Sequence, residues 1–253
     1  MPLYRHALPQ LGPQLLLTDG GLETTLMFHD GVSLPDFNAF PLLGSEAGAA
    51  TLRKYYRAYA EIAQQQRAGL VLESATWRAS ADWAARLGIG ATALAEANRA
   101  SIQLLEVIRA EFQTDVALIV LSGQIGPRGD GYVADGRMTA DAAAAYHAEQ
   151  AQVFAATEAD MLCGMTMNYV EEALGVARAA QGAGMPVVIS FTVETDGRLP
   201  TWSRWHGVRL GWLRQELVYP RQFPTATAAG SLPSSRSQRS ARRDFRLRCA
   251  SRW

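Results

Sequence analysis

Short apolar runs recur along residues 1–201, and a stretch with helical spacing follows most of them. The runs that predict strands are 15–19, 70–75, 117–122, 160–165 and 186–192. The stretches that predict helices are 51–67, 92–112, 139–157 and 169–183, with Thr92 and Thr139 expected as N-caps of the second and third. The strand runs are apolar throughout rather than alternating, which is typical of strands covered on both faces. The pattern therefore predicts an α/β fold with a parallel sheet built from βα units.

Two architectures fit this alternation, an open doubly wound sheet and a (β/α)8 barrel. No Gly-x-Gly-x-x-Gly follows the first strand run, which disfavours a dinucleotide-binding sheet. A barrel instead gathers its chemistry where its strands end. Polar residues stand at the end of every strand run: Asp19, Glu73 with Ser74, Ser122, Thr166 and Thr192. We therefore expect a (β/α)8 TIM barrel, here truncated to about five βα units.

The composition changes at Trp202. Residues 1–201 hold thirteen Lys/Arg and twenty-two Asp/Glu, whereas 202–253 hold eleven Arg, no Lys and two acids. The net charges are thus −9 and +9, and we expect a barrel domain over 1–201 and a disordered tail over 202–253. A natural basic arm for nucleic acid or membrane is one interpretation. We favour a reading-frame slip near codon 201. A tail that arises from such a slip has no function of its own, so we expect neither nucleic acid nor membrane as a partner.

The rest of the composition indicates an intracellular globular chain. The N-terminal stretch does not resemble a signal peptide, and apolar runs such as 117–121 are too short to span a bilayer. Two cysteines, Cys163 and Cys249, form no disulfide framework, so we expect a cytoplasmic protein. Neither they nor His29 and His147 show the spacing of a metal site. We expect Cys163 to be core packing and His147 a surface or hydrogen-bonded residue.

Two segments at the expected rim could carry chemistry. Asp19, followed by Gly20 and Gly21, can accept a proton or hold an ammonium group, and the glycines allow a ligand to approach the backbone. A tight turn is the alternative. Glu73 is a second rim acid, in a segment where Ser80 could cap a helix. The glycine-rich run 122–131 could hold a phosphate, although without Gly-Lys-Ser/Thr a plain loop is the better interpretation.

Taken together, these segments resemble the homocysteine S-methyltransferase family. The matching words are TDGGLETT at 18–25, LESATWRAS at 72–80, Ala97-Asn98, SGQIGP at 122–127, TMNYVEEA at 166–173 and SFTVETDGRLP at 190–200. The resemblance implies a barrel in which zinc binds the thiol of homocysteine, lowers its pKa and lets the thiolate attack a methyl donor. We expect a substrate site at Asp19, Gly20, Gly21, Glu73 and Thr166, of which Asp19 is the one residue that transfers cleanly from the family, and the resemblance implies a small-molecule thiol and a methyl donor as partners.

Two departures from the family pattern matter. The family's zinc ligands are a Cys after the sixth strand and a Cys-Cys pair further on. The resemblance stops at Thr201, and nothing like either word follows it. Many members also carry a Glu at the end of the fourth strand, where Met165 stands here. We therefore expect a methyltransferase-like chain that binds no zinc and is inactive, with no catalytic residue assigned. The alternatives are a nucleic-acid-binding protein with a genuine basic tail and a metal-free barrel lyase using Asp19 and Glu73.

Five βα units cannot close a barrel that needs eight. The first and fifth strands should then present unpaired edges with apolar faces. We expect aggregation or self-association as a consequence.

A slip near codon 201 makes a direct prediction about the gene. Shifting the frame by one nucleotide should replace Trp202 onward with a sixth strand that ends in an Asn-Cys-Ala-His-like word, then a Gly-Gly-Cys-Cys word. The restored chain should reach roughly 300 residues, the size of a barrel of about 250 residues with insertions. Sequencing the gene past codon 201 tests this. If neither alternative frame supplies the cysteines, the tail is native and the basic-arm interpretation leads.

Overall fold

The structure, a computed structural model, describes residues 1–116, 118–195, 198–200 and 217–218. Contacts along the chain separate a unit Met1–Pro220 from a unit Arg221–Trp253, and the first unit is described below. Most of the Arg-rich tail, including Cys249, lies outside the described residues. No helix in the described part is long and apolar enough to cross a membrane.

Five parallel strands form the sheet, and each pairs with the next along the chain. They are β1 (Leu16–Thr18), β2 (Gly69–Glu73), β3 (Ile119–Ile125), β4 (Met161–Met167) and β5 (Val187–Phe191). A doubly wound sheet would reverse its strand order at a switch point, whereas sequential order is that of a barrel wall. The predicted truncated α/β barrel is confirmed as an open half-barrel of five parallel strands, the first four of which are followed by helices in the described part of the chain.

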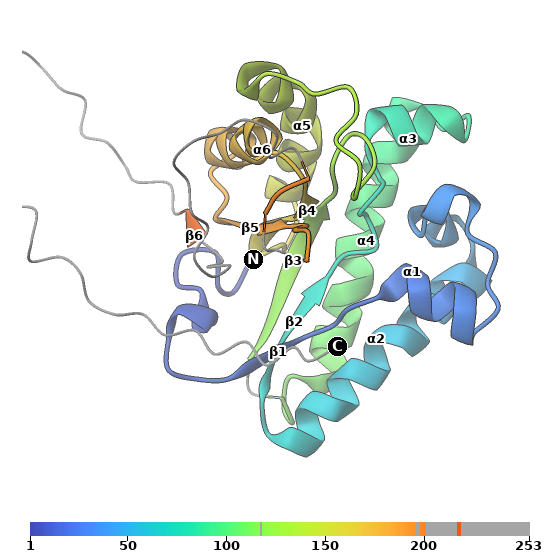
Figure 1. Cartoon of the computed structure of the whole chain (residues 1–253). Helices are drawn as coiled ribbons and strands as arrows, with labels where there is room; N and C mark the ends of the chain where they lie inside the picture. Colours follow the sequence, from blue (N-terminus) through green and yellow to red (C-terminus); the bar gives the residue numbers. More distant parts are fainter. Residues whose placement is uncertain (117, 196–197, 201–216, 219–253) are drawn as a thin grey trace, which may run out of the picture. The chain divides into compact units, whose positions relative to one another are not determined.

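Four long helices line one face of this sheet (Figure 1). They are α2 (Glu46–Gln66), α4 (Ala91–Phe112), α5 (Ala140–Ala155) and α6 (Val170–Gly182). Two short helices lie in the rim loops, α1 (Leu22–Thr24) before α2 and α3 (Ala81–Arg86) before α4. A helix beginning after Ser80 was one interpretation of the sequence, whereas α1 was not predicted.

The helix starts show which capping predictions hold. The Thr139 side chain accepts a hydrogen bond from the Ala142 amide at 3.2 Å and caps α5, as predicted. Thr92 was wrong as a cap, because Gly90 occupies the N-cap of α4 and Thr92 lies inside the helix. Helix α2 begins earlier than predicted because Ser45 accepts a hydrogen bond from the Gly48 amide at 3.1 Å. A serine in this position satisfies an amide that the helix itself leaves free.

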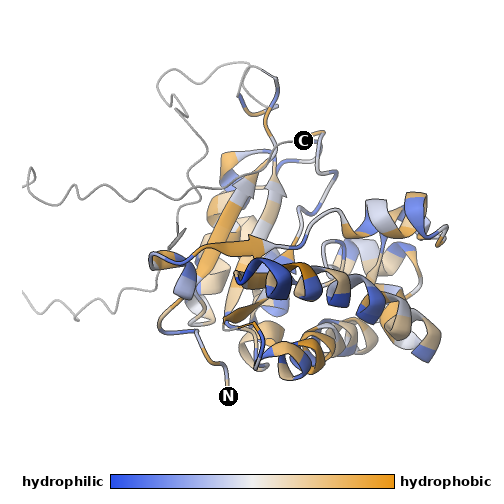
Figure 2. Cartoon of the chain, turned by 90° about the horizontal axis from the view of Figure 1, so that it is seen from below, coloured by the Kyte–Doolittle hydropathy of each residue, from blue (hydrophilic) through white to orange (hydrophobic). Residues whose placement is uncertain are grey.

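The two faces of the sheet pack against different partners. Alternate strand residues such as Leu70, Leu121 and Leu162 join the helices in the main core. Figure 2 shows apolar and polar residues alternating along these helices, as amphipathic packing requires. The inner face carries a second cluster, Val71, Val120, Met161, Cys163 and Val188, covered by Leu8 of the N-terminal segment. Cys163 is therefore buried in the core, as predicted.

One edge of the sheet differs from expectation. The fifth strand was predicted to be unpaired, but β6 (Leu217–Val218) pairs with it antiparallel, opposite Val187 and Val188. This pairing supplies hydrogen-bond partners to an edge that a complete barrel would cover with its next parallel strand. On the other side, β1 pairs only with β2 among the described residues.

A buried carboxylate holds the lower part of the sheet together. Asp160 has no exposed surface, and its Oδ2 accepts hydrogen bonds from the Leu121 amide and from Arg109 Nη1, both at 3.0 Å. Its Oδ1 accepts a hydrogen bond from the Tyr4 amide at 2.8 Å. The Arg109 side chain is itself only 9% exposed. One side chain therefore connects β3, α4 and the segment that covers the inner face.

Removing this carboxylate should be costly. Asp160→Asn leaves the Arg109 guanidinium buried without a counter-charge, and breaking a buried pair in this way costs about 3–5 kcal/mol. We expect a fall in the free energy of unfolding of that order in urea titrations. The control is Asp141→Asn, which removes a carboxylate that is 92% exposed in its pair with Arg178 and should change stability by less than about 1 kcal/mol. Equal stability of the two variants would contradict the assignment.

Candidate functional site

The carboxyl ends of β1 and β2 bring two acidic side chains together. Asp19 follows β1, and its Oδ1 accepts a hydrogen bond from the Glu73 amide at 2.7 Å. The single proton of the Tyr55 hydroxyl of α2 is shared between Asp19 Oδ2 at 3.2 Å and the Gly20 carbonyl at 2.9 Å. Both acids are almost fully buried, with exposed fractions of 8% for Asp19 and 7% for Glu73. Parallel neighbouring strands end at the same edge, which explains why residues 54 positions apart meet here.

The electrostatics of this pair are unusual for carboxyl groups. Burial raises the pKa of Asp19 to about 8, and the charge of Glu73 adds a smaller increase. Hydrogen bonds from the Glu73 amide and from Tyr55 act in the opposite direction and lower the pKa. Burial likewise raises the pKa of Glu73 to about 7, although the Ser122 hydroxyl and the Cys163 thiol lie close enough to oppose the shift. No ion pair in the described part of the chain involves either acid.

Two polar atoms beside this pair, Glu73 Oε2 and Ser122 Oγ, are buried without a hydrogen bond of normal geometry. Their residues lie opposite each other in the β2–β3 register, and Ser122 is fully buried. The Ser122 hydroxyl still lies close enough to the Glu73 carboxyl to lower its pKa, so these two groups interact with each other. Buried polar atoms are almost always hydrogen-bonded, so a ligand or water at this strand end would complete an imperfect interaction.

Gly20 and Gly21 leave the backbone beside Asp19 open, as the sequence predicted. Gly21 has φ 64°, the left-handed conformation that favours glycine, and it precedes helix α1. The Gly20 carbonyl accepts hydrogen bonds from the Tyr55 hydroxyl at 2.9 Å and the Tyr59 hydroxyl at 2.8 Å. Two tyrosines of α2 therefore hold this turn in place while both glycines remain exposed.

Thr166 lies at the end of β4, but its hydroxyl is already engaged. It accepts a hydrogen bond from Trp77 Nε1 at 2.9 Å and donates to the Met165 carbonyl at 2.7 Å. Its φ of 58° is rare for a β-branched residue and coincides with an irregularity in the β4–β5 register. Met165 itself packs against the inner cluster. The structure thus brings Asp19, Gly20, Gly21 and Glu73 together and gives Thr166 a bond to Trp77.

Trp77 and Arg78 are rim residues that the sequence reasoning missed. Trp77 packs so closely against Gly126 and Gly131 that an added Cβ at either glycine would lie 2.6 Å and 2.8 Å from its ring. The glycines of the 122–131 run therefore make room for an aromatic side chain, which favours the interpretation of that run as a loop. The signal in the sequence was the Trp-Arg pair inside a rim word rich in small residues.

His147 is buried rather than exposed. Its Nε2 lies 3.0 Å from Glu172 Oε1, which also accepts a hydrogen bond from the Arg128 amide at 2.7 Å. This arrangement ties the loop after β3 to helix α6 and fits the prediction of a hydrogen-bonded histidine.

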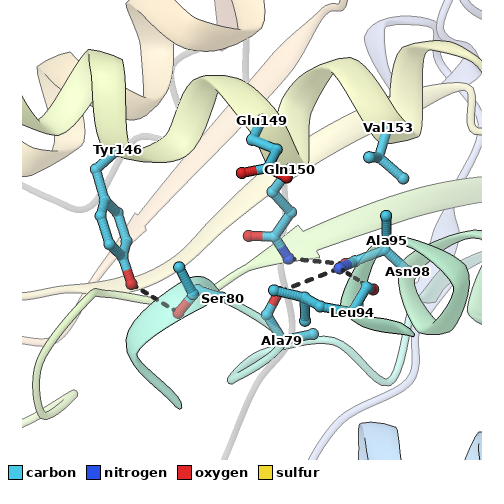
Figure 3. A pocket seen from close by; sticks show the side chains of 10 residues that line it. Ala79, Ser80, Leu94, Ala95, Asn98, Tyr146, Glu149, Gln150 and Val153 are labelled. Carbon is cyan, nitrogen blue, oxygen red and sulfur yellow. Dashed lines mark hydrogen bonds between the residues drawn. The ribbon is translucent and has the colours of Figure 1, made fainter. Parts of the chain in front are cut away.

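A groove on the helix side of the sheet lies between α4, α5 and residues 79–81, which connect β2 to α3 (Figure 3). In it, the Gln150 amide donates to Asn98 Oδ1 at 2.9 Å and the Tyr146 hydroxyl donates to Ser80 Oγ at 3.0 Å. Ser80 occupies the N-cap of α3, as predicted, but its side chain makes no capping bond. The polar groups of the groove bind one another, so the groove adds nothing to the rim site.

The described residues offer no recognisable metal centre. Within the described part, no group of three His, Cys, Asp or Glu side chains is arranged to hold a metal ion. The one described cysteine, Cys163, is buried in β4, and burial followed by the charge of Glu73 raises the pKa of its thiol. A zinc-binding thiolate needs the opposite shift.

Comparisons with known proteins agree with the fold described above. The family model of homocysteine S-methyltransferase matches residues 16–205, so the match ends close to the change in composition at Trp202. The oxidized form of the homocysteine methyltransferase MmuM from Escherichia coli superposes with a TM-score of 0.63 at 19% identity, covering 76% of this chain and 67% of that chain. Its metallated form gives 0.62 at 18% identity, covering 77% and 68%. No curated protein sequence matches.

The structural likeness supports the barrel fold, and the family match covers most of the chain from β1 through β5. The chain belongs to the homocysteine S-methyltransferase family.

Proposed function

We propose that the rim around Asp19 binds a thiol methyl acceptor that carries an amino group, such as homocysteine. The observation that carries this proposal is a pair of buried carboxyl groups with no cationic partner in the described part of the chain. Buried charges are normally paired, so without a cation the free protein keeps Asp19 protonated below about pH 8. An ammonium group between Asp19 and Glu73 would stabilise their charged forms.

The surrounding residues support a ligand in this place. Gly20 and Gly21 leave backbone exposed beside Asp19, and the unpartnered Glu73 Oε2 and Ser122 Oγ offer further acceptors. The family resemblance places a Glu where Met165 stands, and Met165 here packs against the inner apolar cluster. Glu73 thus serves as the second carboxylate of the site. Thr166 contributes to the rim through its bond to Trp77.

Zinc chemistry does not fit the side chains that the structure describes. The family resemblance implies three cysteine ligands, whereas the sequence holds Cys163 and Cys249. Cys163 is buried beside Glu73 with a raised thiol pKa, so it is a poor zinc ligand. Without a metal, an acceptor thiol with a free pKa of about 8.5 stays mostly protonated near pH 7. We therefore propose that this chain by itself binds the acceptor and does not transfer the methyl group.

Binding of L-homocysteine to the purified full chain tests the function. Isothermal titration should show binding that Asp19→Asn weakens by roughly 10–100-fold, because hydrogen bonds to charged groups contribute about 1.5–3 kcal/mol. Asp141→Asn is the matched control and should leave the affinity unchanged. If the unaltered chain does not bind L-homocysteine, the proposed function is wrong. If the chain transfers methyl groups in the presence of zinc, the proposal that it is inactive is wrong.

The raised pKa of Asp19 also predicts the pH dependence of stability. Unfolded Asp loses its proton near pH 4, whereas Asp19 in the folded chain keeps it until about pH 8. Between these values the folded state binds more protons than the unfolded state, so the stability contributed by the protonated group is lost as pH rises. Asp19→Asn should remove this loss.

The measurement is the melting temperature of the unaltered chain and of Asp19→Asn at pH 5 and pH 8. On raising the pH, the unaltered chain should lose at least about 2–4 °C more than Asp19→Asn does, which corresponds to about 1 kcal/mol. Parallel changes in the two proteins would show that Asp19 titrates normally.

A further inference from the structure

The N-terminal segment, residues 1–12, lies against the inner face of the half-barrel without joining the sheet. It forms no strand, and its one regular element is a three-residue turn of 3-10 helix at Pro9–Leu11. Of residues 1–15, only Leu8 is buried, with 3% of its surface exposed. Segments with few buried apolar contacts open at a lower free energy than the core does, so this segment is a place where local opening is expected.

Arg5 attaches this segment to one short connection, residues 155–161, between α5 and β4. Nη1 of Arg5 donates to the Ala155 carbonyl at 3.0 Å. Nη2 donates to the Thr157 and Ala159 carbonyls at 2.9 Å and 2.7 Å. The last carbonyls of a helix lack partners within it, and a cation is favoured there. The polar attachment therefore depends largely on one side chain.

Leu8 lies one layer below the acidic pair of the rim. Side chains two positions apart on a strand share a face, so Val71 lies below Glu73 on β2 and Val120 below Ser122 on β3. Leu8 belongs to the same inner cluster as Val71 and Val120. The N-terminal segment therefore closes the inner face directly beneath the candidate site.

Cys163 connects this floor with the site above it. Its side chain belongs to the inner cluster with Leu8, and its thiol lies close enough to Glu73 to form a hydrogen bond with that carboxyl group. Cys163 is only 2% exposed, so a reagent in solution reaches the thiol only after some part of the chain opens. The reactivity of this thiol therefore reports how the inner face opens.

We propose that residues 1–12 form a strap that opens while the sheet stays folded and gives solvent access to the candidate site from the inner face. Opening removes Leu8 from the inner cluster and Arg5 from the connection after α5. It leaves the buried ion pair of Asp160 and Arg109 in place, so the sheet keeps its anchor. Opening requires no ligand and is independent of the proposed function.

A strap that is a permanent part of the core would behave differently. Cys163 would then react only when the whole chain unfolds, and its rate of reaction would rise steeply with urea because global unfolding exposes a large surface. Opening of the strap alone exposes little surface. The rate would then be nearly independent of urea at concentrations below the unfolding transition.

The experiment measures the rate at which iodoacetamide labels Cys163 in the full chain at a series of urea concentrations. Cys249→Ser leaves Cys163 as the only thiol. We expect a rate that is flat at low urea and rises steeply only near the unfolding transition. Arg5→Gln should raise the flat rate about 10–100-fold, because it removes hydrogen bonds from a charged group that hold the strap closed.

Arg178→Gln is the matched control. Arg178 is an exposed arginine of α6 that pairs with Asp141 at the other end of α5. The substitution is the same, but it does not touch the strap. The rate of labelling should change less than about twofold, because exposed ion pairs contribute little to stability.

Each outcome decides the proposal. A rate that follows global unfolding at every urea concentration would show that the strap is a fixed part of the core. A flat rate that Arg5→Gln leaves unchanged would assign the opening to another segment and would equally overturn the proposal. The urea dependence of the chain with an unaltered strap decides the first point even if Arg5→Gln does not fold. L-homocysteine is absent throughout, so a failure here leaves the proposed function standing.

Discussion

The buried carboxylate of Asp160 is the interaction on which the half-barrel depends most directly. It binds the Leu121 amide at β3, the Arg109 guanidinium from α4 and the Tyr4 amide of the N-terminal segment. That segment places Leu8 over the inner face of the sheet. In a closed barrel, the side chains of the remaining strands would fill this space. Here Asp160 fixes the segment that covers it, together with the Arg5 guanidinium, which donates to the carbonyls of Ala155, Thr157 and Ala159.

The upper end of the sheet has the opposite electrostatic character. Asp160 has a buried cationic partner, whereas Asp19 and Glu73 have none in the described part of the chain. Asp160, Asp19 and Glu73 are all buried acids, so burial alone does not distinguish the two ends of the sheet. The difference is the cationic partner. A buried acid that has a raised pKa and no cationic partner at a strand end indicates a functional site rather than a structural ion pair.

Much of the fold could be predicted because its signals are local. Apolar runs predicted all five parallel strands to within a few residues, and helical spacing predicted α2, α4, α5 and α6. Errors arose where hydrogen bonds outside the pattern decide a boundary. Ser45 starts α2 earlier than its apolar spacing does, and Gly90 rather than Thr92 begins α4. The pairing of β6 with β5 depends on a contact between residues far apart in the sequence, and no local pattern predicts it.

The sequence by itself determined the α/β class and the acids at the strand ends, because periodicity records which faces are buried, and the resemblance of its short words identified the family. It also identified Asp19, Gly20, Gly21 and Glu73 as rim residues. Only the tertiary structure decided that the Glu73 amide binds Asp19, that the Thr166 hydroxyl is occupied by Trp77, and that Arg78 lies nearly buried between two tryptophans. These features depend on the distance between atoms far apart in the chain. Burial and partnership set the charge of a side chain, and both exist only after the strands and loops have come together.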